Sequence, residues 1–289
     1  KTMTERMAEF NEDRSFNTSL MAFFAATALS LALVGIYGVL SSNIGRRIRE
    51  NKFLDFKPYP TQREAIESGR PITTMFGANQ SGKSHTAAHR MTWDTLGIYP
   101  EWYNGPRTAT AIDSWVVGKS NESTRDTCQR KLFGPDPNKP GEGGLIPPGK
   151  ILGKPTMRHN VPGAFDTVRV LHVSGQVSTV QFKSYSMGVD ALMGWTGHRI
   201  WVDEEPPWDC FSELKMRVSA THGLIFVTFT PLLGKTPLYI SLSDETNPHI
   251  WFGWLTAEEA SHLGTAHIEE MRRLYANDPA GFRARVYGT

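Results

Sequence analysis

Residues 77–84, GANQSGKS, constrain the fold of this chain more than any other segment, because they match the phosphate-loop pattern G-x-x-x-x-G-K-[ST]. In such a loop the glycines let backbone N–H groups surround the phosphates of a nucleotide, the lysine reaches the β and γ oxygens, and the last hydroxyl holds a magnesium ion. The flanking sequence supplies the required context, since residues 71–76 have the pattern of a strand and residues 84–93 that of a helix. The candidate nucleotide-binding residues are Gly77, Ala78, Asn79, Gln80, Ser81, Gly82, Lys83 and Ser84.

A second, acidic element completes the predicted site. The apolar residues 200–202 are followed by Asp203, Glu204 and Glu205. Asp203 suits the magnesium shell, and Glu204 suits the orientation and polarisation of an attacking water. Acids just before two prolines can also simply open a helix at its positive dipole end, but the pairing with the phosphate loop favours the nucleotide site. The predicted chemistry is magnesium-dependent ATP hydrolysis, with Glu204 and Lys83 as catalytic residues and Ser84 and Asp203 as metal ligands.

The length and charge of the chain limit the remaining possibilities. Its 289 residues allow one domain of about 240 residues plus an appendage. The chain has 31 Lys and Arg and 29 Asp and Glu residues. Residues 1–50 hold six of the basic and five of the acidic residues, which leaves 25 basic and 24 acidic residues in 51–289, so each of the two segments has a net charge of +1. DNA binding must therefore rest on local patches rather than on overall charge. The two cysteines, Cys128 and Cys210, have no metal-like spacing and predict a reducing compartment.

Residues 20–40 form a run of 21 residues without a charged side chain. At about 1.5 Å per residue, a helix of this length is roughly 31 Å long, close to the thickness of a bilayer core. We predict a transmembrane helix, and the nearby Arg46, Arg47 and Arg49 would place its C-terminal side in the cytoplasm. A signal peptide is disfavoured by the length of the run, the mixed charges before it and the start at Lys1. A buried helix of a soluble protein is the other alternative.

Strand and helix patterns alternate after a short connector at residues 51–60, which predicts a mainly parallel α/β sheet. We expect strands at 72–76, 114–117, 168–173, 179–184, 200–202 and 224–228. We expect helices at 61–69, after the first two strands and near 211–218, and one or two closing helices within 257–275. The Gly- and Pro-rich residues 134–163 predict a long irregular excursion. The expected fold class is a P-loop NTPase of the ASCE type with flanking helices, preceded by one transmembrane-type helix.

Three further features lie where a motor ATPase would need them. Gln62, in the sequence PYPTQ, precedes the loop, and its amide can both donate to and accept from an adenine edge. Residues 224–231, LIFVTFTP, predict an apolar strand that ends in hydroxyls, with Thr228 and Thr230 placed to sense the γ-phosphate. An ordinary surface glutamine and a buried strand ending in a turn are the respective alternatives. Arg217 is expected to cap a helix rather than reach the site.

In their order and spacing, residues 53–289 resemble the ATPase domain of the large terminase subunit of tailed bacteriophages. The matching segments are 60–62, 77–84, 201–207, 228–231 and 282–288. The resemblance implies a motor that uses ATP and Mg²⁺ to move double-stranded DNA into a procapsid in the host cytoplasm. Its implied partners are the portal protein, on which the subunits form a homo-oligomeric ring, and a small terminase subunit.

Two departures from this family pattern affect the expected activity. Family members carry a C-terminal nuclease domain of the ribonuclease H type, whereas this sequence stops at Thr289, so we expect no DNA cleavage. Many relatives place an arginine inside the phosphate loop, where this chain has Asn79 and Gln80. An arginine that stabilises transition-state charge is therefore expected from a neighbouring subunit.

Residues 1–50 resemble a transmembrane helix and the cytoplasmic arginine-rich turn of FtsX-like ABC-exporter permeases, through residues 23–40 and 46–50. A packaging motor has no physical need for a bilayer anchor. We therefore interpret the chain as two units, a permease-like segment 1–50 and a terminase-like ATPase domain 51–289, joined near Glu50 and Asn51. Contact with an inner membrane would be confined to residues 20–40.

Two other functions compete with the packaging motor. The ATPase of an ABC transporter carries an LSGGQ signature, and the nearest match, VSGQ at 173–176, lacks one glycine and lies between strand patterns. A helicase-like DNA translocase shares most of the motifs. However, residues 203–205 lack the Ala/His pattern of helicase boxes, and no second motor domain follows in this sequence.

Overall fold

The computed structural model describes residues 3–50 and 52–288, and the side chains of residues 5–15, 17, 19 and 40–50 lie outside the described part. The chain divides into two compact units, residues 1–50 and residues 51–289.

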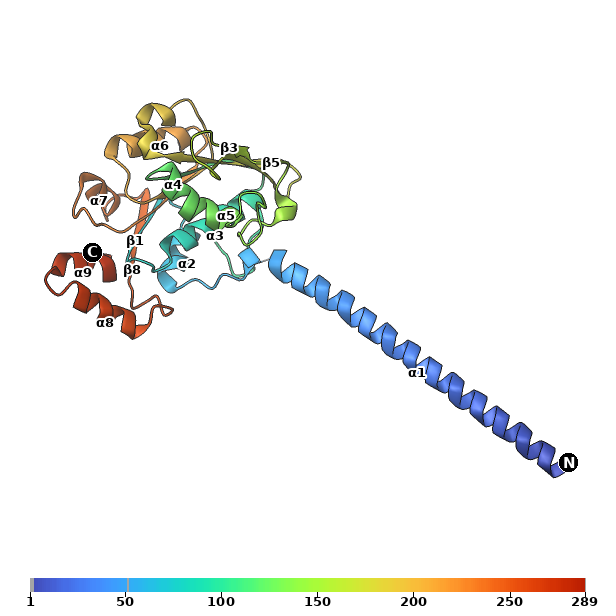
Figure 1. The fold of residues 1–289 in the computed structure, drawn as a ribbon. Coiled ribbons are helices and arrows are strands. Elements are labelled where there is room, and N and C mark those ends of the chain that lie inside the picture. Colours follow the sequence, from blue (N-terminus) through green and yellow to red (C-terminus); the bar gives the residue numbers. More distant parts are fainter. Residues whose placement is uncertain (1–2, 51, 289) are drawn as a thin grey trace. The chain divides into compact units, whose positions relative to one another are not determined.

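The first unit is a single helix, α1 (Met3–Glu50), of 48 residues (Figure 1). It is longer than the predicted helix at 20–40, because no proline interrupts the sequence on either side of the apolar run. Residues Leu20–Val39 have a mean hydropathy of 2.1 and no buried side chain, so by length and composition they can cross a membrane, a property that signal sequences share. The side chains of Arg46, Arg47 and Arg49, on which the predicted orientation rests, lie outside the described part.

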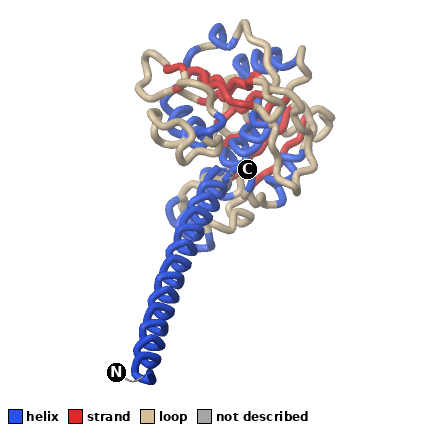
Figure 2. Tube along the Cα trace, turned by 90° about the vertical axis from the view of Figure 1, so that its right-hand side faces the viewer, coloured by secondary structure: helices blue, strands red, loops and turns tan. Residues whose placement is uncertain are grey.

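The second unit is built on one eight-stranded sheet with the strand order β3-β4-β5-β2-β6-β7-β1-β8 (Figure 2, red). The strands are β1 (Ile72–Gly77), β2 (Asp113–Gly118), β3 (Thr156–Met157), β4 (Phe165–Leu171), β5 (Val177–Ser184), β6 (Arg199–Asp203), β7 (Leu224–Phe229) and β8 (Ile250–Leu255). Neighbouring strands pair in parallel from β5 to β8, whereas β4 pairs antiparallel with both β5 and β3. The expected mainly parallel α/β fold is therefore confirmed, with an antiparallel edge.

Helices cover both faces of this sheet, and Figure 1 shows α3 and α6 on opposite sides of it. The helices are α2 (Pro60–Glu67), α3 (Lys83–Leu96), α4 (Asn121–Thr124), α5 (Arg130–Phe133), α6 (Trp208–Ser219), α7 (Pro237–Leu242), α8 (Gly264–Leu274) and α9 (Pro279–Val286). One buried cluster packs α3 and α5 against one face and includes Trp93 and Trp201. A second cluster packs α6 and α7 against the other face and includes Ile200 and Phe211. Adjacent β6 residues thus serve opposite cores, as a side-chain period of two requires.

Several predicted boundaries are wrong. The strand expected at 168–173 is β4, which ends at Leu171. The chain turns after that residue, and the turn is closed by the N–H of His172, which donates to Gln176 O at 3.0 Å. The helix expected at 61–69 begins at Pro60, in keeping with the preference of proline for the first helical position, and ends at Glu67. Residues 257–263 form turns, so α8 is the one helix within the stretch 257–275. The elements β3, β8, α7 and α9 were not predicted.

The segment 134–163 is irregular, as expected, apart from a single 3₁₀ turn at Pro148–Lys150 and the short β3. It is nevertheless tied to α5, because Gly141 N–H donates to Phe133 O at 2.6 Å and Ile146 N–H donates to Leu132 O at 2.9 Å. Ile146 is fully buried in the core beside α3. The excursion therefore contributes to the core rather than forming a loose surface loop.

Candidate nucleotide-binding site

The phosphate loop connects the carboxyl end of β1 to the first turn of α3, so its backbone N–H groups lie at a helix N-terminus. Two of its residues have a left-handed backbone, Gln80 with φ of 60° and Gly82 with φ of 99°. The φ of Gly82 favours glycine there, and a Cβ atom on this residue would lie 2.8 Å from Gln62 Nε2. The sharp turn brings the side chain of Gln62 against the loop.

Lys83 is buried, and its ammonium group is held inside the loop. Its Nζ donates to the carbonyl oxygens of Gly77 at 2.9 Å and Ala78 at 2.6 Å, and to Thr230 Oγ1 at 3.0 Å. Burial lowers the pKa of Lys83 to about 8, against the opposing effect of two nearby carboxylates, which favour the charged form. The amine of Lys83 is therefore still mostly protonated at pH 7, and because the group is buried, little water solvates its charge.

Asp203 ends β6 and meets hydroxyl groups from two other elements. Ser84 Oγ donates to Asp203 Oδ1 at 2.7 Å, and Thr228 Oγ1 donates to the same oxygen at 2.8 Å. Trp201 Nε1 donates to Thr228 Oγ1 at 3.0 Å and fixes that hydroxyl. The structure therefore brings together the two predicted metal ligands, Ser84 and Asp203, which lie 119 residues apart in the sequence.

This pair fits a magnesium ion. Mg²⁺ prefers oxygen ligands and is usually held by one or two carboxylates together with substrate phosphates and water. Ser84 and Asp203 supply one hydroxyl and one carboxylate. The described part of the chain holds no group of three or more His, Cys, Asp or Glu side chains able to hold a metal alone. The donor set therefore suits an ion that arrives with a nucleotide.

Glu204 has a φ of 69°, a strained conformation for a residue with a side chain. Its N–H donates to Thr228 O at 2.8 Å, and Tyr185 Oη donates to its carbonyl oxygen at 3.0 Å, so neighbouring elements hold the strained turn in place. The surrounding protein and the Asp203 carboxylate raise the pKa of Glu204, and Lys83 partly opposes this. A raised pKa makes the carboxylate a stronger base and suits it to accept a proton from water.

Thr230, at the end of β7, links that strand to the phosphate loop. Besides accepting from Lys83, its Oγ1 lies 2.9 Å from Gly77 O and 3.1 Å from Asn79 Oδ1. Thr228, two residues earlier, is buried behind Asp203. The two predicted sensor threonines therefore hold different places, one in contact with the loop and one behind the acidic residue.

A cavity of about 710 Å³ opens over these side chains. Its lining is Phe56, Lys57, Tyr59, Gln62, Asn79, Gln80, Ser81, Gly82, Lys83, Ser84, His85, Lys131, Glu204, Thr230 and His262. Four of the predicted site residues stand behind the cavity wall, namely Gly77, Ala78, Asp203 and Thr228. Gly77 and Ala78 act there through their carbonyl oxygens, which accept from Lys83. The remaining predicted residues face one space large enough for a nucleotide.

Gln62 lines this cavity and is only 2% exposed. Its Oε1 accepts the N–H of Tyr59 at 2.9 Å across the first turn of α2. This bond leaves the amide nitrogen as the free donor, next to Gly82. The first turn of α2 is also bonded to the C-terminal part of the unit, because the N–H of Thr61 donates to Glu259 Oε1 at 2.8 Å.

Six lining residues were not predicted as site residues, namely Phe56, Lys57, Tyr59, His85, Lys131 and His262. Two of them, Lys131 and His262, come from segments far from every predicted motif. Lys131 lies on α5, directly after a π-helical turn at Arg125–Gln129, and adds a further cation to the cavity beside Lys57 and Lys83. His262 comes from the turns before α8. No motif marks either residue, because each is a single side chain brought in from a distant segment. Arg217 lies outside the lining and forms an ion pair with Glu213 at 2.8 Å on α6, consistent with the expected helix-terminal position.

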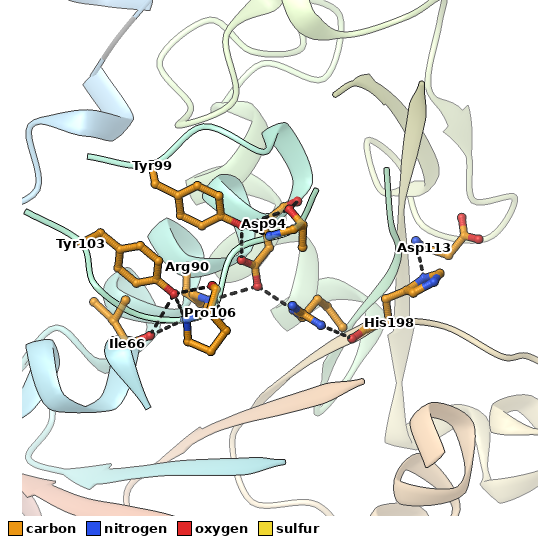
Figure 3. Close-up of polar contacts among 10 residues, drawn as sticks. Ile66, Arg90, Asp94, Tyr99, Tyr103, Pro106, Asp113 and His198 are labelled. Carbon is orange, nitrogen blue, oxygen red and sulfur yellow. Dashed lines mark hydrogen bonds and ion pairs between the residues drawn. The ribbon is translucent and has the colours of Figure 1, made fainter. Parts of the chain in front are cut away.

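Behind the site, a buried ion-pair network joins α3 to β6. Asp94 Oδ2 accepts from Arg90 Nε at 3.0 Å and from Arg199 Nε at 2.6 Å, and Asp94 is 1% exposed. Figure 3 shows that Tyr99 and Tyr103 point toward the same cluster, and Tyr99 Oη donates to Asp94 Oδ1 at 2.8 Å. α3 begins at Lys83 and β6 ends at Asp203. The network therefore joins the C-terminal part of α3 to the start of β6, while the opposite ends of these two elements carry Lys83 and Asp203.

Comparisons with known proteins match most of this chain to one family. A family model described as "Terminase large subunit, T4likevirus-type, N-terminal" matches residues 74–289. The large terminase subunit of Salmonella phage P22 is 29% identical over 253 residues, which cover 80% of this chain and 50% of that protein. The chain thus spans about half the length of this curated relative.

Two solved structures share the fold. The large terminase ATPase domain of Thermus phage P74-26 superposes with a TM-score of 0.54 at 16% identity, covering 81% of this chain and 94% of that one. The large terminase of another thermophilic bacteriophage, solved in complex with ADP, superposes with a TM-score of 0.55 at 11% identity, covering 79% of this chain and 52% of that one. Neither match extends over the whole chain.

Proposed function

The chain belongs to the family of phage terminase large subunits, and we propose that residues 51–289 form a magnesium-dependent ATPase that drives double-stranded DNA into a procapsid. The observation that carries this proposal is that Lys83, Ser84 and Glu204 line one nucleotide-sized cavity, while Asp203 accepts from Ser84 directly behind its wall. A solved relative of the same fold holds ADP.

The residues of the site divide the work of hydrolysis. Lys83 neutralises the phosphate charge from inside the loop, and loop N–H groups at the start of α3 bind the phosphate oxygens. Ser84 and Asp203 hold a magnesium ion, which neutralises charge that develops on the phosphates. Glu204 accepts a proton from the attacking water. Thr230, in contact with both Lys83 and the loop, is placed to respond when the γ-phosphate leaves.

The remaining features of the motor are proposed from the family. We expect the chain to act in the host cytoplasm at the portal of the procapsid, as a homo-oligomeric ring with a portal protein and a small terminase subunit as partners. Among the described residues, the cavity lining holds two lysines besides Lys83, namely Lys57 and Lys131, and no arginine. A neighbouring subunit in the ring is therefore proposed to supply the arginine that stabilises the transition state.

Membership in the terminase family disfavours the two competing functions, the helicase-like translocase and the ABC-transporter ATPase. For residues 1–50, support for the permease-like segment is limited to one apolar helix, Leu20–Val39. We propose that any contact with the inner membrane is confined to this stretch and that the boundary between the units lies near Glu50 and Asn51.

Equilibrium binding of ATP tests the proposed phosphate and metal ligands. Lys83→Ala removes the charge that faces the phosphates, so nucleotide binding should be lost with or without magnesium. Asp203→Asn should weaken chiefly the magnesium-dependent part of binding, because it removes the carboxylate but keeps its size. Lys139→Ala is the matched control, since this exposed lysine pairs with Glu142 outside the cavity lining. Equal ATP affinity for Lys83→Ala and Lys139→Ala would contradict the assignment.

A further inference from the structure

A second cavity, of about 440 Å³, shares part of its lining with the nucleotide-binding cavity. His85 and Lys131 line both cavities. His85 directly follows Ser84 at the start of α3, and Lys131 lies on α5. The wall common to the two cavities therefore begins next to a residue that is proposed to hold the magnesium ion. No step of the proposed hydrolysis uses the second cavity.

The charged side chains that line the second cavity are mostly basic. Lys52, Arg130 and Lys131 line it, together with a single carboxylate, that of Asp126. Both oxygens of this carboxylate accept from Arg125, at 2.7 Å and 3.0 Å. Within the described part of the chain, none of the three lining cations forms an ion pair. Such an excess of positive charge attracts an anion.

Two segments of the chain shape this basic cavity. The first is the π-helical turn Arg125–Gln129, a form that is frequent at functional sites, and it leads directly into α5 with Arg130 and Lys131. The second is the irregular segment 134–163, because the N–H of Leu145 donates to Lys131 O at 3.0 Å and Leu145 also lines the cavity. The side chain of Leu145 is buried in the core. The irregular segment therefore contributes a firmly held wall.

A phosphate ion matches the chemistry of the basic cavity. It carries negative charge and offers acceptor oxygens, whereas Lys and Arg side chains supply donors only. The planar guanidinium of Arg130 suits a bidentate contact with two phosphate oxygens. Thr127, which also lines the cavity, adds a hydroxyl donor. ATP hydrolysis releases such an ion in the neighbouring nucleotide-binding cavity.

We infer that the basic cavity binds the phosphate ion that ATP hydrolysis releases, with Arg130 as a ligand in this cavity only and Lys131 facing both cavities. This inference rests on the proposed function, because the phosphate is a product of that reaction. The ion meets the same cation, Lys131, in either cavity. Binding in the basic cavity separates the phosphate from ADP and so opposes the reverse reaction.

The test measures binding of inorganic phosphate while the nucleotide-binding cavity is filled. The full chain is kept in mild detergent and saturated with magnesium and a non-hydrolysable ATP analogue, and phosphate is then titrated and followed by phosphorus NMR. Hydrogen bonds to charged groups are stronger than neutral ones, so Arg130→Gln should bind phosphate at least about tenfold more weakly than the parent. Arg130 is changed because, unlike Lys131, it lines the basic cavity only. The affinity of Arg130→Gln for the analogue checks that the unit is folded.

Arg169→Gln is the matched control, since Arg169 is an exposed arginine of β4 outside the lining of both cavities. It should bind phosphate like the parent. Absence of phosphate binding in the analogue-filled parent overturns the proposal, and so does equal phosphate affinity in Arg130→Gln and the parent. If Arg130→Gln loses affinity for a short DNA duplex while its phosphate affinity is unchanged, the basic cavity is a DNA contact, which also overturns the proposal.

A single turnover of ATP tests whether the bound ion is the product of hydrolysis. Quenched flow gives the time of cleavage, and a fluorescent phosphate sensor gives the time at which phosphate leaves the chain. Phosphate should leave the parent with a lag after cleavage, and this lag should shorten in Arg130→Gln because the ion is held less tightly. No lag in the parent, or the same lag in both chains, contradicts the assignment to product phosphate.

Failure of the proposed function gives a different result. A parent chain that does not bind the ATP analogue contradicts the proposed function itself. The phosphate titration of the parent and Arg130→Gln then tests the basic cavity alone, because Arg130 lies outside the lining of the nucleotide-binding cavity.

Discussion

Replacing Asp94 by asparagine is expected to destabilise the second unit strongly. The carboxylate is 1% exposed and receives two guanidinium groups, Arg90 at 3.0 Å and Arg199 at 2.6 Å, while the side chains of both arginines are at most 15% exposed. An asparagine keeps the size of the side chain but leaves these two cations without a counter-charge. Removing one partner of a buried ion pair costs about 3–5 kcal/mol, because the other charge stays buried and unpaired.

For a unit of this size, each kcal/mol lowers the melting temperature by about 2–4 °C, so Asp94→Asn should melt about 6–20 °C below the parent. Urea unfolding followed by tryptophan fluorescence gives the free energy of unfolding directly. Trp93, on α3, lies in the buried core cluster and is one of the tryptophans that report on unfolding. The control is Asp126→Asn in the exposed pair Arg125–Asp126, where solvent screening should limit the loss to less than about 1 kcal/mol. A loss of less than about 1 kcal/mol for Asp94→Asn would refute this reasoning.

The same network predicts how stability depends on pH. Burial alone would raise the pKa of Asp94, but the charges of Arg90 and Arg199 outweigh burial, so its pKa in the folded chain is lowered. The stabilisation is then fully present above the unfolded pKa of about 3.9 and is lost as the pH falls through the folded value. The parent should therefore lose stability below about pH 4, and Asp94→Asn should show a shallower loss. Parallel pH profiles would contradict the assignment.

Three further predictions concern the whole unit. Because the pKa of Lys83 is about 8 in the chain without nucleotide and phosphate favours its charged form, ATP binding at pH 8 should take up roughly half a proton; calorimetry in buffers of different ionisation enthalpy measures this uptake, and none should occur at pH 6. Residues 51–289 alone should be soluble and bind ATP with magnesium, since this unit holds the whole cavity lining; recovery only from detergent-extracted membranes would contradict the boundary. The chain should not cut supercoiled plasmid with magnesium or manganese, since the described residues hold no acidic cluster for two metals; reproducible linearisation without ATP would reveal a nuclease site.

The residues of the phosphate end could be predicted from sequence because the chemistry is local there. Gly82 needs a left-handed backbone beside Gln62, and the order of glycines, lysine and hydroxyl in one octapeptide reflects a single turn around phosphates. Asp203 could be predicted because it ends an apolar strand, and parallel strands present their carboxyl ends at one edge. The main parallel sheet followed from the same alternation of strands and helices.

Other parts depend on contacts between distant segments and carried no signal. His262 and Lys131 reach the cavity from turns and a short helix that no motif marks. Asp94 and Arg199, 105 residues apart, read as ordinary surface charges of a helix and a strand until the fold pairs them. The strand β8 contains Gly253 among aromatic residues and has mostly half-buried side chains, so it lacks the alternation that identifies a strand.

Single-turnover hydrolysis by Glu204→Gln, measured beside equilibrium ATP binding in the same preparation, tests the central claim most directly. The amide keeps the size of the side chain and loses the base, so this variant should bind ATP like the parent and hydrolyse it about 10²–10⁴-fold more slowly. Glu205→Gln is the neighbouring control, since Glu205 contacts Thr236 and does not line the cavity. It should hydrolyse ATP at close to the parental rate. Parental hydrolysis by Glu204→Gln, with or without loss in Glu205→Gln, would contradict the assignment of Glu204 as the catalytic base.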